Sequence, residues 1–155
     1  MEAKDIEQKE LAYYAGLFDG EGCIHIARIH TQKRRLTYQL VCRVSMYSLS
    51  VLQGLRSRFG GSIYYEKKHP TSNKYGLLWS WSLFSRGAGA FLNEVEPYLK
   101  IKKTQAKLAL QFQANKHNGA HKKAWGNTAK TEGELATEEA QYILMCNLKK
   151  EFSYV

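Results

Sequence analysis

The 155-residue sequence predicts a single α+β domain in which helices cover one face of an antiparallel sheet. Segments with alternating apolar and polar residues occur in two consecutive pairs, and helix-like segments precede, separate and follow these pairs. The chain has only two prolines and no Gly/Ser-rich linker that would divide it. Its apolar content of 44% is sufficient for a hydrophobic core.

The first helix is predicted over 5–19, where apolar residues recur at helical spacing, and Gly20 and Gly22 are expected to end it. The alternating segments 23–30 and 37–46 predict the first two strands. The turn between them carries three positive charges: Lys33, Arg34 and Arg35. One face of the second strand is expected to contain Tyr38, Leu40, Cys42, Val44 and Met46.

A second helix is predicted over about 48–59, where leucines and a phenylalanine recur every three or four residues, and Gly60 and Gly61 stop it. Segments 62–68 and 75–84 predict a hairpin, whose turn consists of Pro70, Thr71, Ser72 and Asn73.

The rest of the chain is predicted to contain three helices and one long loop. One helix covers 86–96, and the basic stretch 100–103 leads into another that ends near residue 115. The polar segment 116–136 is expected to be a loop. A last helix begins at Thr137, with an apolar face made of Ile143, Leu144 and Leu148. The predicted order is α-β-β-α-β-β-α-α with an additional terminal helix, in one domain over 1–155 whose core spans about 5–115.

The polar sides of the four strands are expected to form an exposed basic sheet face. Its candidate members are His25, Gln39, Arg43, Ser62, Tyr64, Glu66, Lys68, Ser80 and Ser82. A twisted ribbon with such a face can lie in the major groove of DNA and contact base edges. An ordinary solvated sheet face is the alternative explanation of the same pattern.

The net charge of +9, with a pI near 9.5, favours a polyanionic partner. Nucleic acid is favoured over a membrane surface because no basic amphipathic helix with a clean apolar face is present; the alternative is a basic protein without such a partner. No run of about 18 apolar residues predicts a membrane span, and the polar N-terminal segment does not resemble a secretory signal. Three widely spaced cysteines suggest reduced thiols, so we expect an intracellular protein.

Two carboxylates, Asp19 and Glu21, follow the first helix and are separated by one glycine. The helix dipole disfavours negative charge at this end by roughly a few tenths to 1 kcal/mol, so a compensating partner is expected. A local cap or a nearby lysine is one explanation. The other is a divalent cation, because hard oxygen ligands of this kind suit Mg²⁺.

Small residues at Ala12, Gly16 and Gly20 leave one face of the same helix almost without side chains. Such a face allows a second helix to approach closely, and a second copy of the chain would then form a two-fold symmetric dimer. A helix lying flat on its own sheet is the alternative. Dimerisation would bring two Glu21 residues near the symmetry axis, as cleavage of both strands of a duplex requires.

The segment from Tyr14 to Gly22, Tyr-Ala-Gly-Leu-Phe-Asp-Gly-Glu-Gly, closely resembles the motif of the LAGLIDADG homing endonucleases. The order of elements over about 5–115 also matches the fold of this family. Phe59–Ile63 resembles the turn into its third strand, and Pro97–Ala106 resembles its lysine-bearing segment.

The resemblance implies specific roles. Glu21 would bind a divalent metal, Mg²⁺ or Mn²⁺ in its place, together with the carbonyl of Gly20. Asp19 would be the weaker of the catalytic candidates, with a more structural role at the end of the helix, and Lys102 would be catalytic by organising water or stabilising the transition state. The sheet, with Arg34, Arg35 and Lys103, would bind DNA.

A chain with one motif implies a homodimer that cuts both strands of a long pseudo-palindromic site and leaves short 3′ overhangs, as in intron homing. One departure concerns Met46 or Tyr47, which occupies the place of a Gln found in several relatives and puts the peripheral water network in doubt.

Two alternatives remain open. A non-cleaving protein of the same fold would bind intron RNA as a maturase or DNA as a regulator, and a basic structural or assembly protein would leave the Asp-Gly-Glu-Gly turn unexplained. Relatives occur in organelle introns, bacteria, archaea and phages, so the sequence does not specify the compartment.

Overall fold

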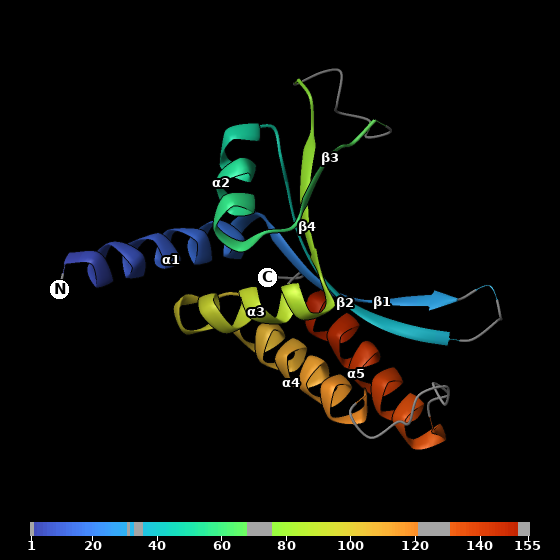
Figure 1. Cartoon of the computed structure of the whole chain (residues 1–155). Helices are drawn as coiled ribbons and strands as arrows, with labels where there is room; N and C mark the ends of the chain where they lie inside the picture. The colour runs from blue at the N-terminus through green and yellow to red at the C-terminus, as the bar shows by residue number, and fades with distance from the viewer. Residues whose placement is uncertain (1, 31, 33–35, 68–75, 121–130, 152–155) are drawn as a thin grey trace.

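A computed structural model describes residues 2–30, 32, 36–67, 76–120 and 131–151, except for the side chains of 117–120. Within this part of the chain, five α-helices and a four-stranded antiparallel sheet form the α+β fold predicted from the sequence (Figure 1). In chain order the elements are α1 (Glu2–Glu21), β1 (Gly22–His30), β2 (Leu36–Met46), α2 (Leu49–Phe59), β3 (Ser62–Tyr65), β4 (Trp79–Phe84), α3 (Ser85–Val95), the 3₁₀ turn η1 (Glu96–Tyr98), α4 (Lys103–Ala120) and α5 (Glu132–Glu151).

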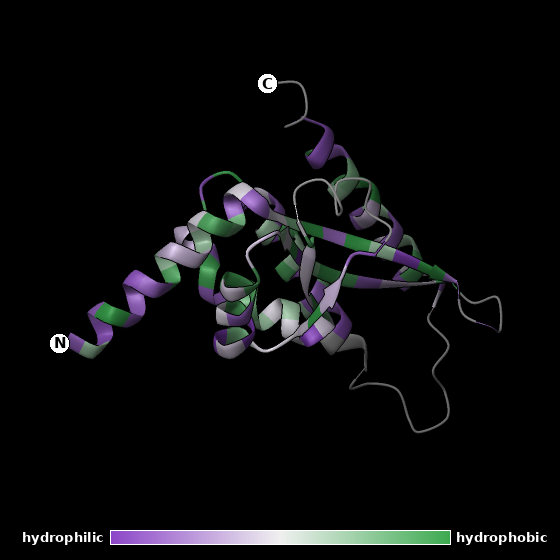
Figure 2. Ribbon diagram, turned by 90° about the horizontal axis from the view of Figure 1, so that it is seen from above, coloured by the Kyte–Doolittle hydropathy of each residue, from purple (hydrophilic) through white to green (hydrophobic). Residues whose placement is uncertain are grey.

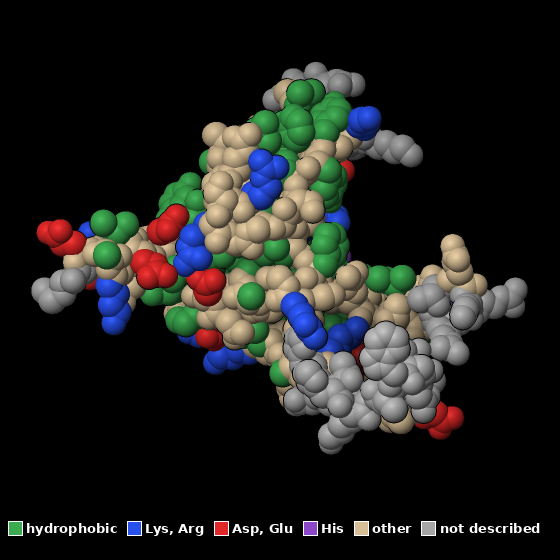
Figure 3. Space-filling model, viewed as in Figure 1, with side chains coloured by type: hydrophobic (Ala, Val, Ile, Leu, Met, Phe, Trp, Pro, Cys, Tyr) green, Lys and Arg blue, Asp and Glu red, His purple; other side chains and the backbone are tan. Residues whose placement is uncertain are grey.

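The sheet has the strand order β1-β2-β4-β3, so β2 and β4 are the central strands, and β1 and the short β3 are the edge strands. The β1–β2 hairpin and the β3–β4 pair diverge as two arms (Figure 1). The helices lie on the outer side of this bend, and the space-filling view is hollowed between the arms (Figure 3). The fold therefore presents a concave sheet face without helices, in line with the prediction that helices cover only one face of the sheet.

The hydrophobic core lies between the other sheet face and the helices. As predicted, Tyr38, Leu40, Cys42 and Val44 of β2 point into it, and Met46 is half-buried. Phe91 of α3 is central, because its ring lies 5.0 Å from Phe18, 4.8 Å from Phe59 and 5.3 Å from Trp81, each in an edge-to-face arrangement. These contacts join α1, α2, α3 and β4 through buried aromatic rings.

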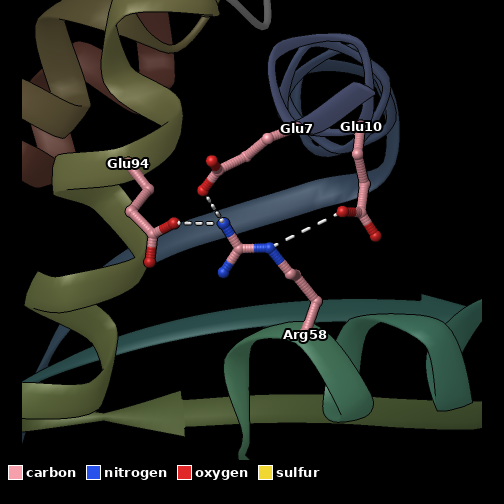
Figure 4. A network of polar contacts seen from close by, with 4 residues as sticks. All are labelled: Glu7, Glu10, Arg58 and Glu94. Atoms are coloured by element: carbon pink, nitrogen blue, oxygen red, sulfur yellow. Dashed lines mark hydrogen bonds and ion pairs between the residues drawn. The ribbon is translucent and has the colours of Figure 1, made fainter. Parts of the chain in front are cut away.

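Arg58 fixes the direction in which α1 leaves the core (Figure 4). Its guanidinium bridges Glu94 of α3 at 2.7 Å and two residues of α1, Glu7 at 3.4 Å and Glu10 at 3.7 Å. Beyond this network the first half of α1 projects from the body and is mostly hydrophilic (Figure 2). No helix in the described ranges has the length and apolarity needed to cross a bilayer.

The predicted end of the first helix is wrong by two residues. Gly20 lies inside α1, which continues to Glu21, and Gly22 is already the first residue of β1. Glycine is tolerated inside the helix here because the surrounding tertiary contacts of Tyr14, Ala15 and Phe18 hold this turn in place.

The C-terminal region also differs from the prediction. Helix α4 extends to Ala120 and α5 begins at Glu132, so both helices occupy parts of the expected loop 116–136. The predicted apolar face of the last helix is wrong in part: Leu148 packs half-buried against the core, but Ile143 and Leu144 are each 48% exposed, and the buried residues are Glu138, Gln141 and Met145. Polar contacts of α5 with Arg28 and Lys116 contribute to the orientation of this helix on the fold.

Three contacts hold α5 against the rest of the fold. The Arg28 guanidinium lies 4.5 Å from the centre of the Tyr142 ring and also forms an ion pair with Glu139. Lys116 of α4 lies 3.9 Å from Glu138. Together with the packing of Met145 and Leu148 against the core, these contacts determine which side of α5 faces inward, and apolar periodicity alone did not identify that side.

Candidate active site

The junction between α1 and β1 contains the predicted metal-binding residues. No loop separates Glu21, the last residue of α1, from Gly22, the first residue of β1. A Cβ atom at Gly22 would lie 2.2 Å from the Phe18 ring and 2.5 Å from the Phe18 carbonyl oxygen, so a side chain does not fit there. The tight junction leaves the Glu21 side chain exposed.

Asp19 is nearly buried and connects the end of α1 with the segment that precedes α4 through hydrogen bonds. Its carboxylate accepts hydrogen bonds from the backbone N–H of Lys100 at 2.8 Å and of Lys102 at 2.9 Å. Both oxygens therefore hold the segment that precedes α4. This geometry gives Asp19 a structural role, in line with what the family resemblance implies.

The hydrogen bonds of Asp19 hold Lys102 at the same α1–β1 junction. Its ammonium group donates a hydrogen bond to the backbone carbonyl of Asp19. Burial lowers the pKa of Lys102 and Lys149 lowers it further, whereas Asp19, Cys23 and Glu21 raise it. The structure thus brings Glu21, Asp19 and Lys102 together although about 80 residues separate them in sequence.

The register shows that the predicted sheet-face residues share one face, because directly opposed residues of antiparallel strands point the same way. The rows across the sheet are Cys23–Arg43–Ser82–Ser62, His25–Val41–Phe84 and Ser45–Ser80–Tyr64, with Gln39 opposite Ala27 at the far end. This is the concave face. Glu66, directly after β3, donates its backbone N–H to Leu78.

Ser80 and Ser82 lie on this face but are fully buried, so their expected exposure is wrong. The Ser82 hydroxyl accepts a hydrogen bond from Nε of Arg43 at 3.3 Å. The Ser80 hydroxyl donates to Glu66 at 2.8 Å and lies 2.5 Å from the Ser45 hydroxyl. The serines therefore position the longer side chains above them.

Two other predicted residues of this face have defined surroundings. Gln39 donates to the Ser85 hydroxyl at 3.1 Å. Burial, together with the nearby charges of Lys149 and Arg43, lowers the pKa of His25 to about 4. The imidazole is therefore neutral at pH 7 and presents both a hydrogen-bond donor and an acceptor.

Three groups near the site were missed from the sequence. Phe84 is 44% exposed in the same row as His25, and it was overlooked because only polar members of the face were considered. Cys23 and Lys149 contact each other at 3.0 Å across 126 residues of sequence. The only indication of Lys149 in the sequence was its position as a basic residue in the last turn of a predicted helix.

The other residues predicted from the sequence lie at the ends of α4 and β2 or outside the described residues. Lys103 is the first residue of α4 and is half-buried. Met46 ends β2 and Tyr47 is exposed directly after it. The remaining DNA-binding candidates lie outside the described residues: Arg34, Arg35 and Lys68.

The predicted small-residue face of α1 is open. Ala12, Gly16 and Gly20 are exposed, and a Cβ atom at either glycine would meet no atom within 4 Å. This face lies opposite the side of α1 that packs into the core through Ala15 and Phe18. A second helix therefore has access to the backbone of α1.

The oxygen donors at the junction fit a hard divalent cation. Glu21 supplies a carboxylate, and Gly20 supplies one of the last four carbonyls of α1, which have no partner within a helix. Within the described ranges, no group of three or more His, Cys, Asp and Glu side chains could hold a metal ion.

Comparison with known proteins supports the resemblance. Residues 14–78 match the family model of the LAGLIDADG endonucleases. No curated protein matches the sequence.

Solved structures show the same fold. The homing endonuclease I-CvuI, in complex with the I-CreI target in the presence of Mg, has a TM-score of 0.75 and 18% identity, covering 92% of this chain and 83% of its own. An archaeal intron-encoded homing endonuclease, I-Vdi141I, complexed with DNA, has a TM-score of 0.73 and 15% identity, covering 92% and 85%. The homing endonuclease I-TnaI has a TM-score of 0.62 and 18% identity, covering 92% and 95%.

Proposed function

We propose that this chain, which belongs to the LAGLIDADG endonuclease family, is a site-specific enzyme that binds duplex DNA and hydrolyses a phosphodiester bond in each strand with the help of a divalent cation. One observation carries this proposal. The exposed carboxylate of Glu21 interacts electrostatically with Lys102, at the end of a concave sheet face in a protein of net charge +9.

The concave face has the chemistry for recognising DNA. Arg43 is held in place by Ser82 and its guanidinium lies 5.8 Å from the centre of the Tyr64 ring, so its direction is fixed before DNA binds. Neutral His25 and the amide of Gln39 offer donors and acceptors for base edges. The net positive charge supplies affinity that does not depend on sequence.

The junction would perform the hydrolysis. Glu21 and the Gly20 carbonyl would hold Mg²⁺, which when bound supplies Lewis acidity for the attack of water on the phosphate. Lys102 places an ammonium group beside this position and would stabilise negative charge on the phosphate and the leaving oxygen. Asp19 keeps Lys102 in place by accepting a hydrogen bond from its backbone N–H.

We infer that the enzyme acts as a homodimer formed through the open face of α1. Contact between two copies at Ala12, Gly16 and Gly20 would place both Glu21 residues near the two-fold axis. Each copy would then cut one strand of a pseudo-palindromic site.

The variant Gly16→Leu is expected to be monomeric, because its side chain would occupy the space that a second α1 needs. Sedimentation velocity measures the change in mass. Gly133→Leu is the matched control, since Gly133 lies on a helix and also has open space around it. A dimer that persists in Gly16→Leu would show that this face is not the interface.

Selection from a randomised duplex library tests the function as a whole. Incubation with Ca²⁺ should enrich a bound site of roughly 20 base pairs, and Mg²⁺ should release the same site cut in both strands. Enrichment in Ca²⁺ without any cut in Mg²⁺ or Mn²⁺ would contradict the nuclease proposal. That outcome would favour a non-cleaving binder, and binding of group I intron RNA would then identify a maturase.

A further inference from the structure

The C-terminal helix places a lysine beside the α1–β1 junction. The ammonium group of Lys149 lies 3.0 Å from Sγ of Cys23, which is two residues after Glu21. Cys23 belongs to the row of the concave face that also contains Arg43. Lys149 therefore reaches the edge of the DNA-facing surface nearest to the candidate metal site, although α5 lies outside the segment 14–78 that matches the family.

The position of Lys149 is fixed by the packing of α5. Met145, one turn earlier, is buried in the core. Three turns earlier, Glu138 and Glu139 are held by Lys116 and Arg28. A lysine on a helix anchored in this way is presented in one direction, whereas a lysine on a free terminus is not.

The site around Lys149 is rich in positive charge. Lys149 interacts electrostatically with Lys102, and both Lys149 and Arg43 interact with His25. Lys102 also interacts with two carboxylates, Asp19 and Glu21, of which Asp19 already accepts hydrogen bonds from backbone N–H groups. Like charges gathered at one place repel each other, and a polyanion bound there would remove that repulsion.

We propose that Lys149 contacts the DNA backbone next to the scissile phosphate, so that α5 contributes a cation to each nuclease site. This inference rests on the proposed function and extends it to a helix outside the matched segment. Lysine suits the role because its ammonium group binds phosphate as a compact point charge. Cys23 holds the ammonium group at the edge of the concave face when DNA is absent.

The test compares Lys149→Met with Lys150→Met in the full-length protein. Lys150 is the matched control because it is adjacent, exposed and equal in charge. Binding to the selected duplex is measured in Ca²⁺ over a series of salt concentrations, and single-turnover cleavage is measured in Mg²⁺. Thermal unfolding of each variant reports whether α5 remains folded.

Lys149→Met is expected to reduce the slope of log K against log salt by about 0.9 per copy, the value for one lost phosphate contact. Its cleavage rate should fall by about tenfold or more, and Lys149→Arg should restore most of both losses. Lys150→Met should leave the salt slope close to the parental value and change the cleavage rate by less than about threefold. Parental salt dependence and cleavage in Lys149→Met would overturn the inference.

The two readouts separate this inference from the proposed function. If the parent binds DNA but does not cut it, the salt dependence of Lys149→Met still decides whether Lys149 contacts phosphate. If the parent cuts DNA and both lysine variants behave alike, the nuclease proposal stands and the role of α5 is wrong.

Discussion

Glu21→Gln is expected to reduce DNA cleavage by about a thousandfold or more and to leave most of the duplex affinity intact. The amide keeps the size of the side chain but removes the negative charge that a divalent cation requires of its ligand. Glu21 is exposed at the end of α1, so its replacement removes no packing from the core. Linearisation of a plasmid that carries the selected site, in Mg²⁺, measures the rate, and binding in Ca²⁺ measures the affinity.

Glu132→Gln is the control for this change in charge, because Glu132 is exposed at the start of α5. It should cut at nearly the parental rate. Cleavage by Glu21→Gln at the parental rate would show that the assigned metal ligand is wrong.

Gly22→Ala is expected to destabilise the fold by about 3 kcal/mol or more, because an overpacked core must shift to accept the new atom. The added methyl group would overlap both the ring and the carbonyl oxygen of Phe18. The ring cannot easily move, since it is buried against Phe91. The free energy of unfolding in urea measures the loss.

Gly20→Ala is the matched control two residues earlier. Its methyl group meets nothing within 4 Å, and alanine is a better helix former than glycine by about 1 kcal/mol. Both variants should be measured in the Gly16→Leu background, so that dissociation of a dimer does not contribute. Equal unfolding midpoints for the two variants would contradict the packing at the junction.

Much of the fold could be predicted because burial on one side imposes a clear pattern. The alternation from Tyr38 to Val44 identified β2 and its inward face, since the helices cover only that face. Periodicity failed for α5, where polar contacts of Glu138 and Tyr142 determine the buried side and leave Ile143 exposed. It also failed at Gly20, because local helix signals do not include tertiary support.

The candidate site was only partly accessible from the sequence. Glu21 and Lys102 were assigned through the family resemblance, and no spacing rule could show that Asp19 holds the backbone of Lys102. The burial of Ser82 beneath Arg43 depends on the register of β2 and β4. Lys149 could not be connected with Cys23, because this contact exists only after α5 has packed.

Dimers in which only one copy carries Glu21→Gln test most directly the claim that each copy cuts one strand. Two versions with different affinity tags can be co-expressed, and the mixed dimer can be isolated by purification on both tags. On a plasmid with one selected site, in Mg²⁺, the parental dimer should produce linear DNA and the mixed dimer should accumulate nicked circles. Linear DNA from the mixed dimer at the parental rate would contradict the account.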